Sequence, residues 1–346
     1  HKMEFGSDLK AVARAGAGVN NIPIDACSEK GVVVFNTPGA NANGVKELVM
    51  AGLLLASRKI VPGIEWTKSL QGKGAEVPKL VEKGKGEFVG PEIKGKTFGV
   101  IGLGAIGVLV ANAAEALGME VFGFDPFISV EAAWGLSTNV QRANNLDALF
   151  ASCDYISLHV PYNDKTKNTI NKESISIMKD GVRILNFARG ELVNNADIAA
   201  ALESGKVSCY VTDFPDDEVL KMKNVVPIPH LGASTPESED NCAIMACLQL
   251  KDFLENGNIK NSVNFPNCAL GEKSGRTRIT ILHKNIPDMV HQITAVLGKE
   301  KINIEDMINK SKGNLAYTMI DAGDKISDKM NAALKAIEGV IRVRVL

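Results

Sequence analysis

The chain has 346 residues, of which 45% are hydrophobic and 23% are charged, so it is long enough for two or three globular domains with buried cores. This composition excludes collagen-like and disordered chains. Lys and Arg total 39 against 40 Asp and Glu, with no long run of one sign, and neither nucleic-acid binding nor an acidic tail is indicated. The longest apolar runs fall short of the roughly 20 residues of a membrane span.

The six cysteines lack the paired spacing of a metal site or a disulfide framework. They are Cys27, Cys153, Cys209, Cys242, Cys247 and Cys268. We therefore expect reduced thiols, no structural metal and a cytoplasmic protein. The chain begins His-Lys-Met without a signal-peptide pattern, so we expect its natural start to lie further upstream.

The first part of the chain indicates an incomplete βαβ unit. Apolar strands are predicted at 10–14 and 31–35, on either side of a helix that begins at Pro23. One long helix is predicted over 44–60. The polar, Lys- and Gly-rich stretch 69–96 is predicted to be a loop with a short helix.

From residue 97 onward, short apolar strands alternate with helical patterns. Strands are predicted at 97–101, 120–124, 155–159, 183–187, 208–212 and 225–228, and helices at 102–117, 146–150, 172–178 and 195–204. This alternation predicts an α/β fold with a Rossmann-type, doubly wound parallel sheet. A long helix follows over 236–255, and after residue 271 a βαββαβ order predicts a small ferredoxin-like domain.

The strongest local motif is a GxGxxG at the end of the strand 97–101. Gly102 permits a tight turn, Gly104 lets the backbone approach a pyrophosphate, and Gly107 lets the helix pack on the strand. Asp125 ends the next strand, where a carboxylate accepts hydrogen bonds from ribose hydroxyls and repels a 2′-phosphate. The motif predicts NAD binding; a glycine turn that only packs is the alternative.

Three polar residues stand at or beyond the carboxyl ends of later strands, where ligands of open α/β sheets bind. They are Arg189, Glu218 and His230. A guanidinium holds a carboxylate and an adjacent carbonyl, and an imidazole paired with a carboxylate exchanges a proton near neutral pH. These are the groups of 2-hydroxy-acid chemistry. Each residue also has a structural alternative. Arg189 could only pair with Glu191, His230 could be a loop histidine, and Glu218 could belong to an acidic surface turn.

The sequence resembles the D-isomer-specific 2-hydroxyacid dehydrogenase family over essentially the whole chain. The motifs that carry the resemblance are NTPGANANGVKELVMAGLLLASR (36–58), GKTFGVIGLGAIG (95–107), NFARGELVN (186–194) and PHLGAST (229–235). The resemblance is strongest to members that oxidise D-3-phosphoglycerate to 3-phosphohydroxypyruvate, the first step of L-serine biosynthesis. The C-terminal domain is similar to an ACT domain.

The resemblance implies a catalytic triad of Arg189, Glu218 and His230. Asp217 competes for the acidic role, because a one-residue difference in length around 214–215 would exchange the two acids. The five-residue step from Asp213 favours Glu218.

The same resemblance implies a set of ligand contacts. Cofactor contacts fall on Ala17, Gly102, Gly104, Ala105, Ile106, Gly107, Asp125, Val160, Phe187, Ala188, Asp213, Gly232 and Ala233, and substrate contacts on Gly16, Gly18, Asn41 and Arg189. Ala105 stands where many relatives carry Arg, so backbone amides must hold the pyrophosphate. The family's phosphate-binding Arg-Ser segment would precede Lys2.

The C-terminal domain suggests an effector. Equivalents of His283, Asn285 and Asn303 bind L-serine across a domain dimer in related dehydrogenases, which makes L-serine a possible effector. Asp288 stands where relatives have Gly, and its charge could oppose the serine carboxylate. The alternative is a module that only builds the oligomer.

The resemblance also implies three domains and an oligomer. We expect a flavodoxin-like substrate domain at 1–44 and 235–270, an NAD-binding domain at 45–234 and an ACT domain at 271–346, with the active site between the first two. The segment 62–96 has too little apolar content to fold alone, and the family pairs there, so a homodimer or homotetramer is expected. Alternative functions are a glyoxylate or hydroxypyruvate reductase, another D-2-hydroxyacid dehydrogenase, or a non-catalytic NAD-dependent binding protein.

Overall fold

The computed structural model describes residues 5–273, 275, 277–323 and 325–346. The chain divides into two compact units, one of Asn41–Ser238 and one of His1–Ala40 with Glu239–Leu346. The limits of the first unit lie close to the predicted limits of the NAD-binding domain. The further division of the second unit into a substrate domain and an ACT domain remains a prediction.

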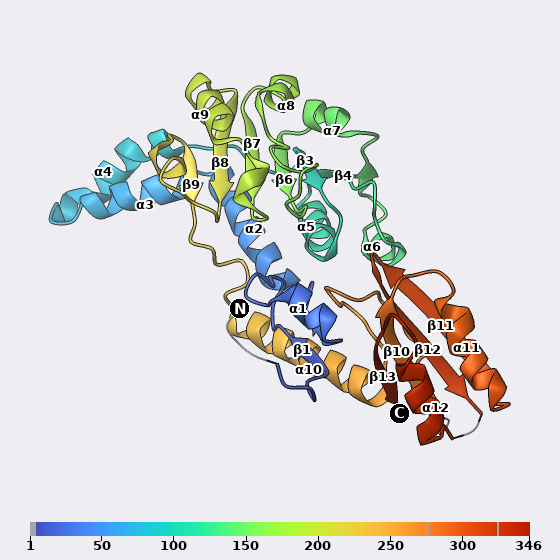
Figure 1. Cartoon of the computed structure of the whole chain (residues 1–346). Coiled ribbons are helices and arrows are strands. Elements are labelled where there is room, and N and C mark those ends of the chain that lie inside the picture. Colours follow the sequence, from blue (N-terminus) through green and yellow to red (C-terminus); the bar gives the residue numbers. More distant parts are fainter. Residues whose placement is uncertain (1–4, 274, 276, 324) are drawn as a thin grey trace. The chain divides into compact units, whose positions relative to one another are not determined.

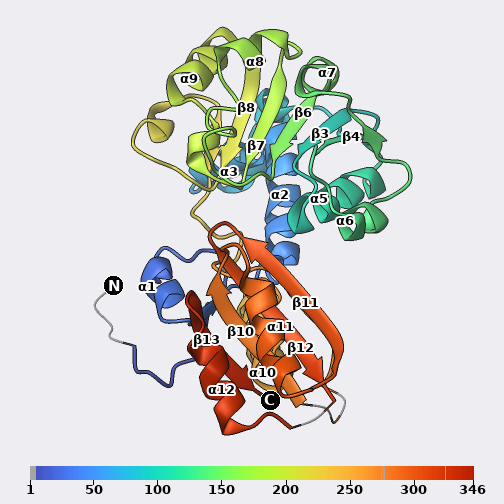
Figure 2. The same cartoon turned by 45° about the vertical axis from the view of Figure 1, so that its right-hand side comes forward.

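The unit Asn41–Ser238 is built on a seven-stranded parallel sheet (Figures 1 and 2). Its strands are β3 (Thr97–Ile101), β4 (Glu120–Phe124), β5 (Gln141–Arg142), β6 (Tyr155–Leu158), β7 (Val182–Asn186), β8 (Val207–Thr212) and β9 (Val225–Pro227). Their order, β5-β4-β3-β6-β7-β8-β9, reverses direction between β3 and β6, as in a doubly wound dinucleotide-binding sheet. The predicted α/β fold is therefore confirmed.

Helices cover both faces of this sheet (Figure 2). They are α2 (Ala42–Ser57), α3 (Ile60–Ser69), α4 (Val77–Gly84), α5 (Ala105–Ala116), α6 (Val130–Gly135), α7 (Leu146–Ser152), α8 (Lys172–Ile177) and α9 (Asn195–Ser204). Apolar side chains of α2 and α5 pack with β3 in one core cluster, and those of α7, α8 and α9 pack with β6 and β7 in another. Among the described residues, no helix combines the length and apolar character needed to cross a membrane.

The helix predicted over 44–60 is interrupted. Helix α2 ends at Ser57, Arg58 is extended with ψ 128°, and α3 starts at Ile60. The reason is Pro62, because the ring of a proline clashes with the carbonyl four residues earlier, here that of Arg58, and removes a donor. Proline is tolerated in the first turn of a new helix, which is where Pro62 lies.

The other unit combines a small parallel pair with an antiparallel sheet. Its elements are β1 (Ala11–Ala13), α1 (Ile24–Glu29), β2 (Val33–Phe35), α10 (Pro236–Asn256), β10 (Thr277–Lys284), α11 (Met289–Lys299), β11 (Ile304–Lys312), β12 (Leu315–Ala322), α12 (Asp328–Lys335) and β13 (Val340–Val345). β1 pairs with β2 in parallel. The other four strands have the order β11-β12-β10-β13, which confirms the predicted ferredoxin-like arrangement.

Side chains of the antiparallel sheet bind the carboxyl end of α10. Tyr317 donates to the carbonyl of Gly257 at 2.6 Å, and Arg344 donates to the carbonyls of Phe253 and Leu254 at 3.0 and 2.8 Å. Cationic donors at a helix carboxyl end satisfy its free carbonyls and oppose its negative dipole. The sheet and α10 therefore form one packed structure.

Candidate active site

The three glycines of the turn after β3 are required for different reasons. Gly102 has φ +91°, and a Cβ there would lie 2.6 Å from the carbonyl oxygen of His159. A Cβ on Gly107 would lie 1.9 Å from the carbonyl oxygen of Gly102, so the chain itself requires both. A Cβ on Gly104 would meet nothing within 4 Å. The space above Gly104, at the start of α5, is open to a ligand.

Residues predicted to hold the cofactor surround this turn. Asp125 follows β4, and its carboxylate accepts from the backbone N–H of Leu103 at 2.9 Å and of Phe127 at 2.8 Å. Val160, two residues beyond β6, lies against the turn, since its Cγ1 is 2.8 Å from where a Cβ of Gly102 would be. Ala105 and Ile106 open α5, with backbone N–H groups that favour an anion. The turn, the acid and Val160 thus meet at the switch point of the sheet.

Asp213, directly after β8, is the most strongly buried acid of the site. Its side chain is 1% exposed, and burial raises the pKa of its carboxyl, opposed by His230, by the backbone N–H groups of Asp213 and Gly232, and by Arg189. Its Oδ1 has no hydrogen-bond partner within the described part of the chain. A buried acceptor without a donor costs free energy. A ligand with an N–H donor, such as the carboxamide of nicotinamide, fits this atom.

Arg189 and His230 come to the same place from different strands. Arg189 follows β7, where the buried Asn186 donates to its carbonyl at 2.8 Å, and its Nη1 donates to the carbonyl of Ala188 at 2.6 Å. His230 lies beyond β9, and its ring centroid is 4.6 Å from that of Phe214. The Arg189 guanidinium carbon is 6.0 Å from the same phenyl ring. Both proposed catalytic side chains are exposed and available to a substrate.

The other predicted contacts in this unit lie at three places. The ring of Phe187 is buried against Gly52 of α2, where an added Cβ would be only 2.8 Å from it, so only its backbone can face a ligand. Gly232 and Ala233 belong to the loop after His230, and the backbone N–H of Gly232 donates to the carboxylate of Asp213. Asn41 is half-buried and starts α2.

Glu218 is held by Asn195 in this structure. Asn195 Nδ2, at the start of α9, donates to Glu218 Oε2 at 3.1 Å and to Asp216 Oδ2 at 2.9 Å. A cavity of about 550 Å³ lies beside them, lined also by Phe214. Asp217 pairs instead with Lys221 in solvent. No hydrogen bond or ion pair between Glu218 and His230 occurs among the described residues, so the acidic role remains a prediction.

The predicted substrate loop lies in the other unit. Gly16 has φ +139°, its N–H donates to Thr37 Oγ1 at 2.7 Å, and Thr37 N–H donates back to its carbonyl at 3.1 Å. Asn36 Nδ2 donates to the carbonyl of Ala17 at 2.8 Å, and a Cβ on Gly18 would meet nothing within 4 Å. The turn is therefore anchored to the residues after β2 and leaves open space at Gly18.

The predicted effector residues differ in their availability. His283 is 2% exposed, its Nδ1 bonds the carbonyl of Lys284 and its Nε2 bonds Thr318 Oγ1, both at 2.8 Å. Asn285 Nδ2 donates to the carbonyl of Gly313 at 3.1 Å, and Asn303 is exposed just before β11. An amino acid that bound His283 would have to displace one of these two partners. Asp288 adopts φ +67°, a conformation that glycine favours.

Comparison with known proteins decides the family. Residues 50–232 match the D-isomer specific 2-hydroxyacid dehydrogenase, NAD binding domain. The chain belongs to this family. It is an NAD-dependent D-2-hydroxyacid dehydrogenase, and the glycine turn, Asp125 and the unpaired Oδ1 of Asp213 are groups that suit NAD.

Several relatives are similar over much of the chain. It is 31% identical to a D-3-phosphoglycerate dehydrogenase of Haemophilus influenzae, over 99% of this chain and 83% of that protein. It is 37% identical to one of Methanocaldococcus jannaschii, over 84% of this chain and only 54% of that protein. A crystal structure of NAD+-bound 3-phosphoglycerate dehydrogenase from Entamoeba histolytica matches with a TM-score of 0.57 and 32% identity, over 75% of this chain and 76% of that one.

Three residues of the site were not identified from the sequence. Asn186 could have been found as the polar end of an apolar strand. Asn195 and Phe214 gave no such signal, since their roles depend on neighbours that only the fold brings to them.

Proposed function

We propose that this enzyme oxidises D-3-phosphoglycerate at C2 to 3-phosphohydroxypyruvate, the first step of L-serine biosynthesis. The observation that carries the chemistry is the convergence of Arg189, His230 and the buried Asp213 at the carboxyl ends of β7, β8 and β9. The choice of substrate is supported by the relatives of that name, which the chain matches over nearly all of its own length.

His230 acts as the general base in the proposed mechanism. It takes the proton of the C2 hydroxyl, while Arg189 holds the substrate carboxylate and the C2 oxygen through charge-assisted hydrogen bonds. Glu218 orients the imidazole and balances the positive charge that develops on it. The backbone N–H groups of Ala105 and Ile106 would hold the pyrophosphate of NAD and Asp125 its ribose, and the bound cofactor would supply the acceptor for the C2 hydride.

The test is the formation of NADH from NAD and D-3-phosphoglycerate, with D-lactate and glycolate as controls. We expect turnover of the phosphorylated substrate alone. Oxidation of the controls only, or reduction of glyoxylate or hydroxypyruvate alone, would contradict the choice of substrate and leave a different D-2-hydroxyacid dehydrogenase.

His230→Asn separates chemistry from binding. The asparagine keeps polarity but cannot act as a base, so turnover falls by about 10² to 10⁴. The affinity for NADH, measured by quenching of protein fluorescence, stays within about twofold. Unchanged turnover would remove His230 from the mechanism.

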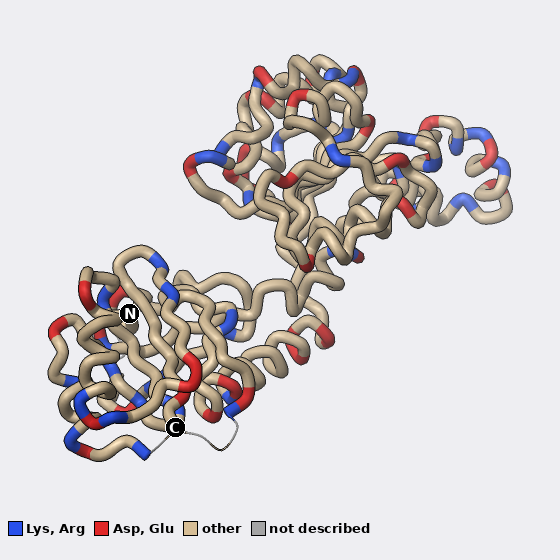
Figure 3. The backbone as a smooth tube through the Cα atoms, turned by 90° about the vertical axis from the view of Figure 1, so that its right-hand side faces the viewer, with Lys and Arg blue, Asp and Glu red and all other residues tan. Residues whose placement is uncertain are grey.

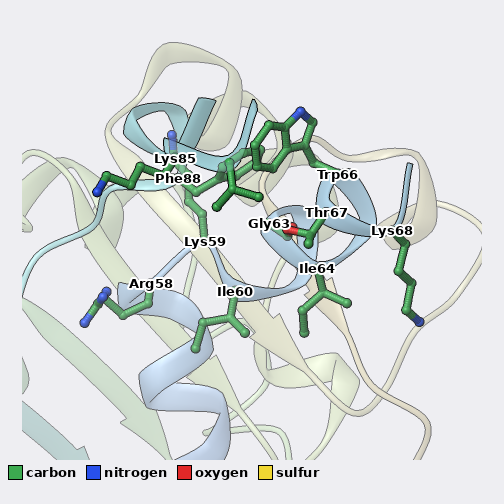
Figure 4. A pocket seen from close by; sticks show the side chains of 11 residues that line it. Arg58, Lys59, Ile60, Gly63, Ile64, Trp66, Thr67, Lys68, Lys85 and Phe88 are labelled. Carbon is green, nitrogen blue, oxygen red and sulfur yellow. The ribbon is translucent and has the colours of Figure 1, made fainter. Parts of the chain in front are cut away.

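The enzyme forms a homodimer in this proposal, through α3 and the residues around it. Exposed apolar side chains gather here, namely Ile60, Val61, Ile64 and Val89 at 42 to 71% exposure. Figure 4 shows Ile60 and Ile64 beside the Trp66 and Phe88 pair, in a cavity of about 480 Å³. The adjoining α4 carries charges of both signs, Lys79, Glu82 and Lys83; Figure 3 shows where acidic and basic residues lie along the whole backbone. An exposed apolar patch with a charged rim is typical of a self-association surface.

L-serine is the effector in this proposal, bound by His283, Asn285 and Asn303. The two amides are exposed and suit the ammonium and carboxylate of an amino acid. Calorimetry with L-serine, and with D-serine as the control ligand, tests the proposal. Equal heats for both ligands would contradict it and leave assembly as the role of the domain.

A cytoplasmic location completes the proposal. Five of the six cysteines are buried thiols, and burial raises the pKa of Cys209 to about 11. Such thiols are typical of proteins that remain in a reducing compartment. Cell fractionation with a tagged chain tests this, and recovery outside the cytoplasm would contradict it.

A further inference from the structure

One aromatic ring contacts two of the proposed catalytic side chains. Phe214 follows Asp213 immediately, its ring centroid is 4.6 Å from that of His230 at an interplanar angle of 49°, and Arg189 Cζ is 6.0 Å from it. The contact to His230 is within the range of tilted aromatic pairs, and the contact to Arg189 is at the outer limit of a cation–π interaction. The ring therefore reaches two residues that the sequence places 41 positions apart.

The backbone around Phe214 fixes the position of this ring. Its N–H donates to Thr212 Oγ1 at 3.1 Å, and Thr212 is fully buried at the end of β8. On the other side, a Cβ on Gly190 would touch Phe214 Cβ at 3.5 Å, so the residue after Arg189 approaches closely. Phe214 itself is only half-buried and lines the cavity beside Glu218. An anchored residue with a partly open ring suits a role in the site.

The chemistry of the reaction makes such a contact useful. His230 is exposed, and its ring makes no hydrogen bond among the described residues, because Glu218, its partner in the proposed mechanism, accepts from Asn195 in this structure. When it takes the hydroxyl proton it becomes a cation, and the π face of a nearby phenyl ring attracts a cation. A ring that both orients the imidazole and favours its charged form lowers the barrier more than it strengthens substrate binding.

We propose that Phe214 is a positioning residue, which orients His230 and Arg189 and stabilises the imidazolium that forms during oxidation. The proposal rests on the proposed function, in which His230 is the base. It assigns to Phe214 no contact with the reacting atoms. Phe214 influences the reaction mainly through His230, because its ring lies closer to His230 than to Arg189.

The experiment compares Phe214→Leu with Phe214→Tyr. Leucine fills most of the volume without a π face, and tyrosine keeps the face. We expect Phe214→Leu to lower kcat for D-3-phosphoglycerate by roughly two- to fivefold, the size of a cation–π contact at an exposed site. KM should rise by less than about 1.5-fold, NADH affinity should stay unchanged, and Phe214→Tyr should restore most of kcat.

A second measurement does not depend on turnover. In the unaltered chain, the ring current of Phe214 shifts the ring-proton NMR signals of His230, assigned with the His230→Asn variant. The shift should vanish in Phe214→Leu and remain in Phe214→Tyr. Phe214→Met, another flexible apolar residue, replaces the leucine variant if that one melts at a lower temperature.

The outcomes separate the two proposals. Equal kcat in Phe214→Leu and the unaltered chain, or loss of NADH binding along with kcat, overturns the positioning role while the dehydrogenase function stands. If the NMR shift is lost in Phe214→Leu but the unaltered chain oxidises none of the 2-hydroxy acids, the contact is confirmed and the dehydrogenase function is contradicted. Absence of the shift in the unaltered chain overturns the inference directly.

Discussion

His283 is a predicted effector contact whose burial also makes it a contributor to stability. Both of its ring nitrogens are hydrogen-bonded within the sheet. Burial lowers its pKa, although the bonds to Lys284 and Asn309 oppose the change. At neutral pH the buried ring is therefore uncharged, and a neutral imidazole has one donor, which the carbonyl of Lys284 requires.

This pKa shift predicts a loss of stability in mild acid. Because the folded pKa is lower than the unfolded value of about 6.5, the unfolded chain takes up the proton first, and the free energy of unfolding falls as pH drops below that value. The slope due to this one group is at most about 1.4 kcal/mol per pH unit. Urea unfolding at several pH values between about 7.5 and 5.5 measures it, a range of about one unit on either side of the unfolded pKa of about 6.5.

The matched variants are His283→Gln and His291→Gln, since His291 is exposed on α11. The first removes the buried titratable ring and makes the pH dependence of unfolding less steep; the part due to His159, whose pKa burial lowers to about 3, remains. The second leaves the dependence as it is in the unaltered chain. Identical slopes in all three proteins would rule out His283 as the cause.

Single residues also mark where prediction from the sequence ends. The strand-end positions of Arg189 and His230 follow from the pattern, because parallel strands place such residues at one edge of the sheet. The contact partners do not follow from it. Glu218 bonds Asn195, and Phe214 contacts His230, because segments distant in sequence meet there.

At the scale of elements, the turn between β3 and α5 separates the requirements of folding from those of binding. Gly104→Ala meets open space, so the free energy of unfolding should change by less than about 1 kcal/mol. The added methyl group would nonetheless occupy the approach to the pyrophosphate, and we expect NADH affinity to fall at least tenfold. Fluorescence titration and thermal melting measure the two effects.

Gly107→Ala is the matched comparison within the same turn. Its methyl group would lie 1.9 Å from the carbonyl oxygen of Gly102, so α5 must move away from β3. Overpacking of this kind costs about 1–3 kcal/mol or more, and the variant should melt at a lower temperature. If Gly104→Ala bound NADH as tightly as the unaltered chain, the open space would not be the pyrophosphate site.

The strands and helices of this sheet were largely predictable because they are buried on both faces. Strands β3 and β4 and helix α9 have the predicted limits, since buried parallel strands are continuous apolar runs. Strand β5 and helix α6 were missed. β5 has only two residues, Gln141 and Arg142, both exposed at the sheet edge, and no apolar pattern marks it.

Besides Tyr317 and Arg344, a buried ion pair contributes to the contact between α10 and the C-terminal sheet. Arg278, 1% exposed, donates to Asp321 at 2.6 and 2.8 Å and to the carbonyls of Asn256 and Gly271 at 2.9 and 2.7 Å. Arg278→Met leaves a buried carboxylate and two carbonyls without donors. Breaking a buried pair in this way costs about 3–5 kcal/mol.

The double variant Arg278→Met with Asp321→Leu tests the origin of that loss. Removal of the second charge should recover part of the stability, because the unpaired carboxylate is then gone. Urea unfolding of the two variants and the unaltered chain gives the comparison. If both variants were equally unstable, the lost hydrogen bonds to α10, and not the unpaired charge, would account for the change.

At the scale of the whole molecule, the apolar surface on α3 predicts that the chain pairs with a second copy. Ile60 and Ile64 are one helical turn apart, 44 and 49% exposed, and extend from the same helix beside the cavity (Figure 4). Ile60→Asp with Ile64→Asp would bury two unpaired carboxylates in a dimer, whereas in a monomer they would stay in water. We therefore expect the variant to be monomeric by light scattering. Its melting temperature should fall only by the amount that dimerisation contributes to the melting temperature of the unaltered chain.

The matched control is Val130→Asp with Trp134→Asp on α6. These side chains are 70 and 86% exposed, so the control adds the same two charges to another exposed apolar surface of the same unit. If dimerisation uses the α3 surface, the control stays dimeric at concentrations where the α3 variant is a monomer. If both variants were monomers, the dimer contact would lie elsewhere or the added net charge would be what prevents dimerisation. If both variants were dimers, the α3 surface would not be the dimer contact.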